Sequence, residues 1–147
     1  MKITKLAILG KLATKFKAPF DDPNYDIWVF NYHKIMPPRY NLWFDLHSIN
    51  PNPIADITRN NFPFSEITNL MGGNYINNSA SYLIAYAILK GYKEIELYGM
   101  RFESPDEIRR QEYHNVRELI FFAKGKGIKI SAPFDPPLFN EYPLYGI

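Results

Sequence analysis

The segment from Asn77 to Phe102 constrains the fold more than any other part of this sequence. It opens with polar residues, continues as an almost entirely apolar helix pattern over 79–90, stops at Gly91, and passes through a short strand pattern over 93–98 to a glycine turn. A capped apolar helix that leads through a glycine into a short strand is typical of a parallel α/β sheet. In such sheets, the residues that open the helix and follow the strand face the ligand crevice.

The other predicted elements alternate along the chain. Four more strands are predicted by short apolar or aromatic stretches between turn residues, over 3–9, 25–31, 41–47 and 128–131. Residues 48–62 predict an exposed loop, and a short helix follows Pro63. A long helix begins with Ser104 as its N-cap and ends at 124–127. Its inward stripe is predicted to be Ile108, Val116, Leu119, Ile120 and Ala123.

Strands that alternate with helices predict an α/β fold with right-handed crossovers. We expect a three-layer, Rossmann-like open parallel sheet of about five strands in the order 3-2-1-4-5. The 147 residues are expected to form a single domain with an irregular aromatic tail over 132–147 that packs on the body. The topological switch then lies between the first and fourth strands, and the crevice lies beside it.

Composition excludes several classes of function. A formal charge of +2 is too small to favour duplex nucleic acid, whereas the lysines near the first strand suit a small anion. The absence of cysteine excludes disulfides and thiolate metal sites and fits a reducing cytosol. The apolar stretch over 3–9 is too short for a signal peptide or a membrane span. We therefore expect a cytoplasmic protein without a membrane partner.

Polar residues gather at the predicted crevice. Gly10, Lys11 and Thr14 follow the first strand, where amides, an ammonium group and a hydroxyl can hold phosphate; the alternative is a glycine turn with solvated lysines. Asn31 ends the second predicted strand and is expected to face the same crevice.

The amino end of the central helix carries the next candidates, Asn77, Asn78 and Ser79. Their side chains and the free amides there either contact an anion or only cap the helix.

Gly99, Arg101 and Phe102 follow the fourth strand. The guanidinium of Arg101 is able to clamp a phosphate or to pair with a nearby glutamate. Phe102 is a candidate for stacking on a base, as are Tyr98 and Trp43, whose alternative is a place in the core.

Asp45 and His47 are the candidate catalytic residues if the chain is an enzyme. They lie two apart at the end of the third strand, so an acid and an imidazole share one face, either for acid–base catalysis or for capping. His114 is expected on the surface of the long helix. The histidines lack metal-binding spacing, and no metal site is expected.

The block from Ser79 to Phe102 resembles the central block of small Rossmann-like proteins of bacteriophages, which look like single-domain bacterial sialyltransferases and glycosyltransferase-like proteins. The resemblance extends to the first glycine loop and to residues 21–23, 43–47 and 142–146. In these relatives, the glycine loop and the polar residues before the central helix hold the nucleotide. The resemblance assigns that role here to Gly10, Lys11, Thr14, Asn77, Asn78 and Ser79.

Two departures separate the chain from these relatives. Ala13-Thr14 stands where they carry Pro-Ser, and Arg101 stands where they carry an acid. The region that covers an acceptor sugar is also missing. The resemblance therefore implies nucleotide binding more than sugar transfer.

The expected function is a phage-type binding protein. It would hold or sequester a nucleotide-derived ligand, such as an ADP-ribose-like or cyclic nucleotide immune signal, with an anti-defence role in the host cytosol. No cofactor is expected, and the aromatic tail favours a homo-oligomer. The alternative is a nucleotide-sugar-dependent glycosyltransferase or a nucleotide hydrolase that uses Asp45 and His47.

Overall fold

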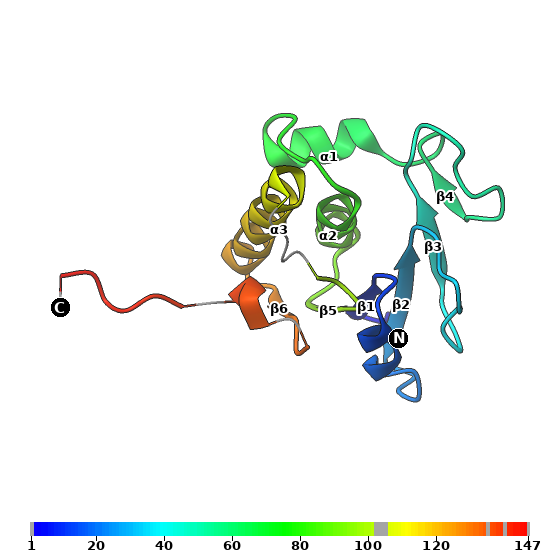
Figure 1. The fold of residues 1–147 in the computed structure, drawn as a ribbon, viewed down its shortest axis with the longest axis horizontal. Helices are drawn as coiled ribbons and strands as arrows, with labels where there is room; N and C mark the ends of the chain where they lie inside the picture. Colours follow the sequence, from blue (N-terminus) through cyan, green and yellow to red (C-terminus); the bar gives the residue numbers. More distant parts are fainter. Residues whose placement is uncertain (1, 102–105, 135, 140, 147) are drawn as a thin grey trace.

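The fold is α/β and is built on one open parallel sheet (Figure 1). The computed structural model describes residues 2–101, 106–134, 136–139 and 141–146, and within them six strands, three α-helices and two 3₁₀ helices form. The strands are β1 (Lys5–Leu9), β2 (Tyr25–Phe30), β3 (Leu42–Asp45), β4 (Ile57–Thr58), β5 (Glu94–Tyr98) and β6 (Lys129–Ser131). The helices are α1 (Phe64–Met71), α2 (Ser79–Lys90) and α3 (Glu107–Gly125), with 3₁₀ helices η1 (Ala13–Lys17) and η2 (Pro136–Phe139).

The sheet has the order β4-β3-β2-β1-β5-β6, and every neighbouring pair is parallel. Both the strand count and the full order therefore differ from the predicted 3-2-1-4-5. The additional strand is β4, which pairs with β3 inside the segment that was predicted to be a loop. Its two residues are too short to produce an alternating pattern. The five longer strands keep their predicted neighbours, and the switch lies between β1 and β5.

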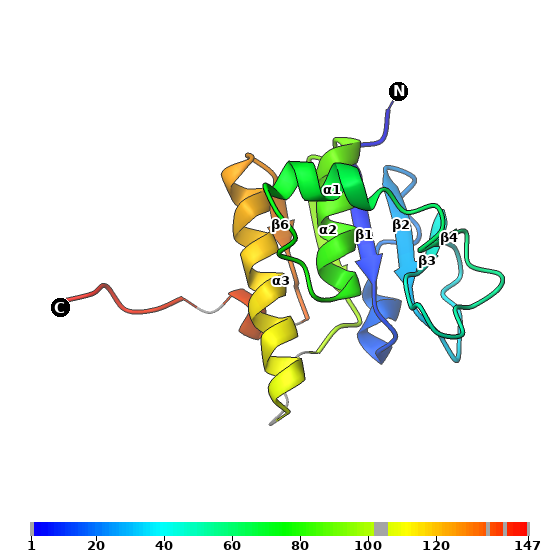
Figure 2. The ribbon, with the colours of Figure 1, turned by 90° about the horizontal axis from the view of Figure 1, so that it is seen from above.

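The two faces of the sheet are covered differently. Figures 1 and 2 show α1, α2 and α3 over the same face, where Leu6, Ile8 and Leu97 are at most 1% exposed. Right-handed crossovers place connections that move toward β6 on this face and those that move toward β4 on the other. The latter connections carry η1 and loops, so the expected second helical layer is replaced by this partial cover.

The central helix α2 matches its predicted burial on more than one side. Leu83, Ile84, Ala85 and Ala87 are fully buried between the sheet and the other helices. The helix ends at Gly91, which has the left-handed conformation with φ of 90°. Its amino end therefore lies at the carboxyl edge of the parallel strands, where the candidate residues gather.

The long helix α3 departs from its prediction at its beginning. The observed N-cap is Asp106, whose side chain accepts the amide of Ile108 at 2.8 Å; the predicted cap, Ser104, lies outside the described residues. Ile108 is 66% exposed, not part of the inward stripe. Its 19 residues make α3 longer than the five-residue β5, so its first turn extends past the sheet. The rest of the predicted stripe is fully buried: Val116, Leu119, Ile120 and Ala123.

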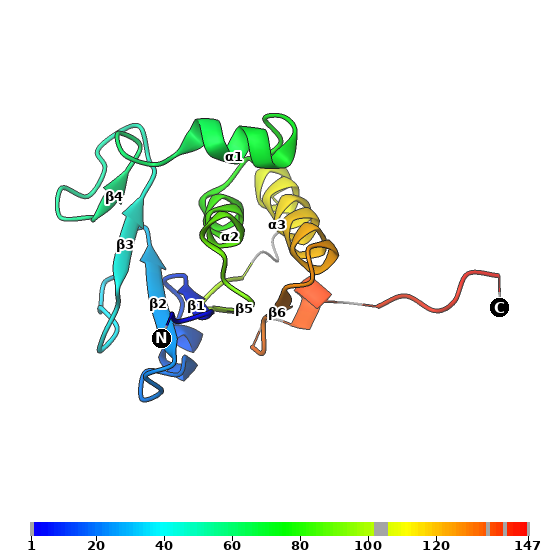
Figure 3. The ribbon, with the colours of Figure 1, turned by 180° about the vertical axis from the view of Figure 1, so that it is seen from behind.

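Residues 141–146, called the tail below, extend away from the body beyond η2 (Figures 1 and 3). Tyr142, Leu144 and Tyr145 are 84%, 75% and 105% exposed. The predicted packing of residues 132–147 on the body is therefore confirmed for Ala132, Leu138 and Phe139, which are buried or pack against the core, and is wrong for residues 141–146. Within the described part of the chain, none of the helices combines the length and the apolar character that crossing a membrane requires.

Candidate functional site

Two glycine turns touch where β1 and β5 end. The amide of Gly10 donates to the carbonyl of Tyr98 at 2.8 Å, and the amide of Leu12 donates to that of Gly99 at 3.0 Å. A Cβ added to either glycine would lie 2.5 Å from the carbonyl oxygen of the other, and Gly99 has φ of +70°. Glycine is required at both positions because any side chain would force the two turns apart.

Thr14 completes this contact. Its hydroxyl accepts the amide of Gly99 at 3.0 Å. Three residues predicted to bind the ligand, Gly10, Thr14 and Gly99, thus meet in this structure, where Thr14 bonds to Gly99 and Gly10 packs against Gly99. Lys11 and Arg101 lie within two residues of the contact and are exposed. The cations, and not the turn itself, face solvent at the switch point.

The polar residues before α2 form a network with α3. Asn78 is the N-cap, and its side-chain oxygen accepts the amide of Ser81 at 3.0 Å. The side-chain oxygen of Asn115 accepts the backbone amide of Asn77 at 3.0 Å and lies 3.2 Å from the side-chain nitrogen of Asn78. Asn115 is 3% exposed and also donates to the carbonyl of Tyr75. These contacts account for capping, and Ser79 begins the helix beside them, half-buried.

The sequence analysis missed a buried pair, Lys15 and His33. The ammonium nitrogen of Lys15 lies 2.9 Å from Nδ1 of His33 and donates to the carbonyl of Ile35 at 2.5 Å. His33 Nε2 lies 3.0 Å from the carbonyl of Phe30, so Nε2 carries the hydrogen and Nδ1 accepts. The two side chains are 3% and 4% exposed. The sequence offered no clear signal for this pair, because Lys15 is one of several lysines near η1 and looks like a solvated residue.

Burial sets the protonation of this pair. Burial, together with the charge of Lys15, lowers the pKa of His33 to about 4, and burial lowers the pKa of Lys15. The pair also connects η1 to the loop after β2, so these two segments lie side by side.

Those two segments carry four exposed apolar residues, which are together called the edge patch. Its members, with exposed fractions of 38%, 46%, 67% and 63%, are Leu12, Phe16, Tyr32 and Ile35. Exposed lysines alternate with them along the chain: Lys11, Lys17 and Lys34. The carboxyl edge thus combines rings and positive charge.

The predicted stacking residues lie elsewhere. Tyr98 and Trp43 are 6% and 5% exposed and belong to the core on the open side of the sheet, and Phe102 lies outside the described residues. Trp43 donates to the carbonyl of Asn31, which has φ of 65°. Among the described buried side-chain atoms, the Asn31 oxygen, just after β2, stands without a hydrogen-bond partner.

Asp45 and His47 form a direct pair at the end of β3. Asp45 Oδ1 accepts from His47 Nδ1 at 2.6 Å, and its Oδ2 accepts the amide of Asn52 at 2.9 Å. Burial would raise the pKa of Asp45, but the hydrogen bonds from Asn52 and His47 lower it overall. The Asp45 side chain is 6% exposed and that of His47 is 58% exposed, so Nε2 of the oriented imidazole is open to solvent.

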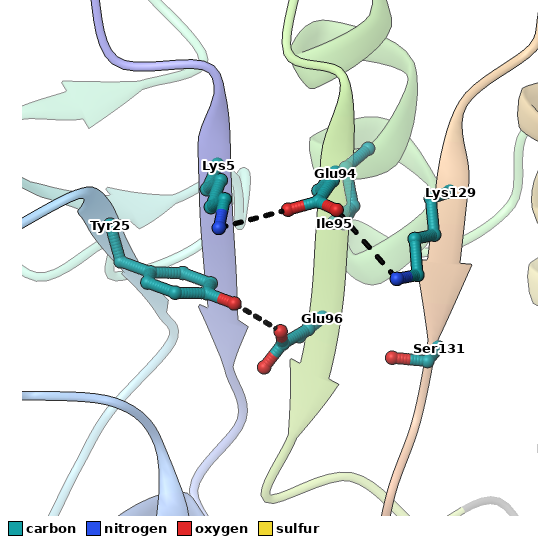
Figure 4. A pocket seen from close by; sticks show the side chains of 7 residues that line it. All are labelled: Lys5, Tyr25, Glu94, Ile95, Glu96, Lys129 and Ser131. Atoms are coloured by element: carbon teal, nitrogen blue, oxygen red, sulfur yellow. Dashed lines mark hydrogen bonds and ion pairs between the residues drawn. The ribbon is translucent and has the colours of Figure 1, made fainter. Parts of the chain in front are cut away.

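The open face of the sheet has a shallow hollow of about 160 Å³ over β5 and β6 (Figure 4). Glu96 accepts hydrogen bonds from the hydroxyls of Tyr25, at 2.6 Å, and Tyr98. The hydrogen bond raises the pKa of Tyr25, and burial together with the hydrogen bond raises the pKa of Tyr98. Glu94 pairs with Lys5 at 3.5 Å and Lys129 at 3.8 Å. The charged and polar groups of this hollow are thus paired with one another. We therefore place the candidate site at the carboxyl edge and not in the hollow.

The remaining histidine and the metal-binding capacity of the chain concern the site as well. His114 lies exposed on α3, as predicted. In the described ranges, histidine, aspartate and glutamate side chains do not group in threes as a metal site requires. The chain matched no protein-family model, no curated protein and no solved structure.

Proposed function

We propose that the chain binds a small anionic, nucleotide-like ligand at the carboxyl edge of the sheet and leaves it unchanged. The observation that carries this proposal is the exposed pairing of rings and cations beside the switch point between β1 and β5. Ligands of open α/β sheets bind outside the carboxyl ends of the strands at such a point.

The cations suit the phosphate groups of this ligand. Lys11 and Arg101 follow the touching turns of Gly10 and Gly99. The close contact between the two turns therefore fixes the backbone near both cations. Arg101 offers a planar fork of donors to a phosphate, and Lys11 offers a compact charge. Their exposure leaves both available to a ligand.

The rings suit a base. Phe16 and Tyr32 adjoin Lys15 and His33 in sequence, and the hydrogen bonds of that buried pair hold their two segments together. Aromatic faces at 46% and 67% exposure offer stacking surface that the fold does not use.

The resemblance to small bacteriophage proteins supplies the ligand class. We include ADP-ribose-like molecules and cyclic nucleotides, sequestered as immune signals in an anti-defence role. The inner polar groups at this edge are already used in capping and turn contacts. This supports a ligand that is held without being turned over.

A ligand panel tests the proposal. Calorimetry against ADP-ribose, cyclic ADP-ribose, cyclic dinucleotides and CMP is expected to show stoichiometric binding by at least one member. Mass spectrometry of the released ligand is expected to return the mass that was added. Failure of every member to bind contradicts the proposal, and a changed mass replaces holding with catalysis.

The pair Asp45–His47 favours a second candidate, a nucleotide hydrolase or a nucleotide-sugar transferase. With Nδ1 held by the carboxylate, Nε2 of His47 can take the proton of a water or an acceptor hydroxyl, while Asp45 stabilises the resulting imidazolium. Turnover that falls in His47→Ala and persists in the exposed control His114→Ala supports this candidate. Turnover that survives His47→Ala rejects it.

A further inference from the structure

Two sets of apolar side chains of this chain lie open to solvent, one on the tail and one on the edge patch. The tail presents Tyr142, Leu144 and Tyr145 at 75% exposure or more. The edge patch presents four residues from η1 and the loops after β1 and β2. Grouped apolar side chains of this kind mark contact surfaces, unlike single exposed apolar residues. The apolar side chains of the tail and those of the edge patch would both be buried if the two surfaces were in contact.

We propose that the tail of one copy docks on the edge patch of a second copy, so that two chains exchange tails in a reciprocal dimer. Figures 1 and 3 show the tail leading away from η2 and from the rest of the body. A tail in this direction reaches a neighbouring molecule without turning back across its own sheet. Exchange of the same segment between two copies closes the assembly with twofold symmetry.

Charge complementarity supports a second copy as the occupant. The tail carries one charged residue, Glu141, whereas exposed Lys11, Lys17 and Lys34 alternate with the edge-patch residues. A negative end meeting a positive rim steers the two surfaces together and sets their orientation.

The backbone of the tail is suited to docking in an extended form. Pro143 fixes its own φ, favours an extended conformation at Tyr142, and lies between the apolar residues. A segment that is already extended loses less conformational entropy on binding. The docked tail would cover Phe16 and Tyr32, the rings that the proposed function offers to a base, so tail and ligand are expected to compete for this surface.

Light scattering coupled to size-exclusion chromatography tests the dimer with matched serine variants. The wild-type chain is expected at twice its mass of 17.2 kDa. The tail variant Leu144→Ser/Tyr145→Ser and the patch variant Tyr32→Ser/Ile35→Ser are each expected to raise the dimer dissociation constant at least about tenfold. The control Ile49→Ser/Ile54→Ser changes residues that are 78% and 71% exposed and lie outside both surfaces, and it is expected to dimerise as the wild type does.

Mixing the two variants separates tail exchange from other dimers. A tail-variant chain keeps its patch and a patch-variant chain keeps its tail, so the mixture restores one of the two contacts and recovers part of the dimer. A dimer in either variant alone at wild-type affinity overturns the proposal, as does a mixture without recovery. A wild-type monomer at all concentrations also overturns it, including one whose tail is protected on its own patch.

Discussion

The carboxyl edge of the sheet consists of two layers that use the same kinds of residue differently. The inner layer bonds to itself and comprises Gly10, Thr14, Lys15, His33, Asn78, Gly99 and Asn115. The outer layer faces solvent and comprises Lys11, Phe16, Tyr32, His47 and Arg101. The two histidines illustrate the contrast, because His33 is 4% exposed whereas the His47 side chain is 58% exposed.

This contrast shows that position at a strand end does not by itself make a residue a ligand contact. Ends of parallel strands leave amides and carbonyls that must be paired, and the inner layer supplies those partners. Changes in the inner layer should therefore reduce stability. Changes in the outer layer should alter binding at nearly constant stability.

The largest loss of stability is expected at the glycine contact. Gly99→Ala places a Cβ 2.5 Å from the Gly10 oxygen at a φ of +70°, and the free energy of unfolding should fall by about 3 kcal/mol or more. Gly127→Ala is the control, since Gly127 has φ of +80° with nothing within 4 Å, and it should cost only about 1 kcal/mol. Urea denaturation measures both, and equal losses would show that the two turns do not need their close contact.

A smaller effect is expected from pH. His33 has its pKa lowered from 6.5 to about 4 in the folded chain, so between these values the unfolded state binds the extra proton. Stability should therefore decrease as pH falls from 6.5 to about 4, by about 2 kcal/mol in total. Denaturation curves at pH 7 and pH 4.5 check this.

The matched variants for this pH effect are His33→Gln and His114→Gln. His33→Gln should flatten the slope, because it removes the buried imidazole, and His114→Gln is its control at an exposed position on α3. If the dependence of stability on pH were unchanged in His33→Gln, His33 would not be the buried group that causes it.

The smallest stability effect distinguishes two neighbouring asparagines. Asn78→Ala removes the N-cap of α2 and should cost about 1 kcal/mol. Asn77→Ala removes an exposed 2.9 Å bond from the Asn78 side-chain nitrogen and a 3.4 Å contact to the carbonyl of Gln111, but it leaves the cap oxygen of Asn78 in place and should stay within about 0.5 kcal/mol. Thermal melts compare the two. A larger loss for Asn77→Ala would contradict the capping network.

The sequence is sufficient to predict elements whose pattern is local. The five longer strands and α2 follow from short apolar stretches and from residues that occupy nearly every face of a helix. The edge strand β4 and the start of α3 at Asp106 do not, because two strand residues carry no period and several residues there are able to cap.

Prediction of the site stops where long-range contacts decide. Lys11 and Arg101 are exposed at the switch point, where the order of elements placed them. The meeting of Gly10 with Gly99 and the burial of Lys15 against His33 depend on two loops approaching each other. A single sequence contains no local signal for such approaches, and nothing in the sequence distinguishes a buried lysine from a solvated one.

The most direct test of the account compares binding and stability in one pair of variants. Lys11→Gln/Arg101→Gln removes two outer cations, and Lys93→Gln removes an exposed cation at the opposite edge, just before β5. With the tightest member of the ligand panel, calorimetry should show at least about a tenfold loss of affinity in the double variant alone. Its unfolding free energy should stay within about 0.5 kcal/mol of wild type. Unchanged affinity in the double variant, or an equal loss in Lys93→Gln, would contradict a ligand site at the carboxyl edge.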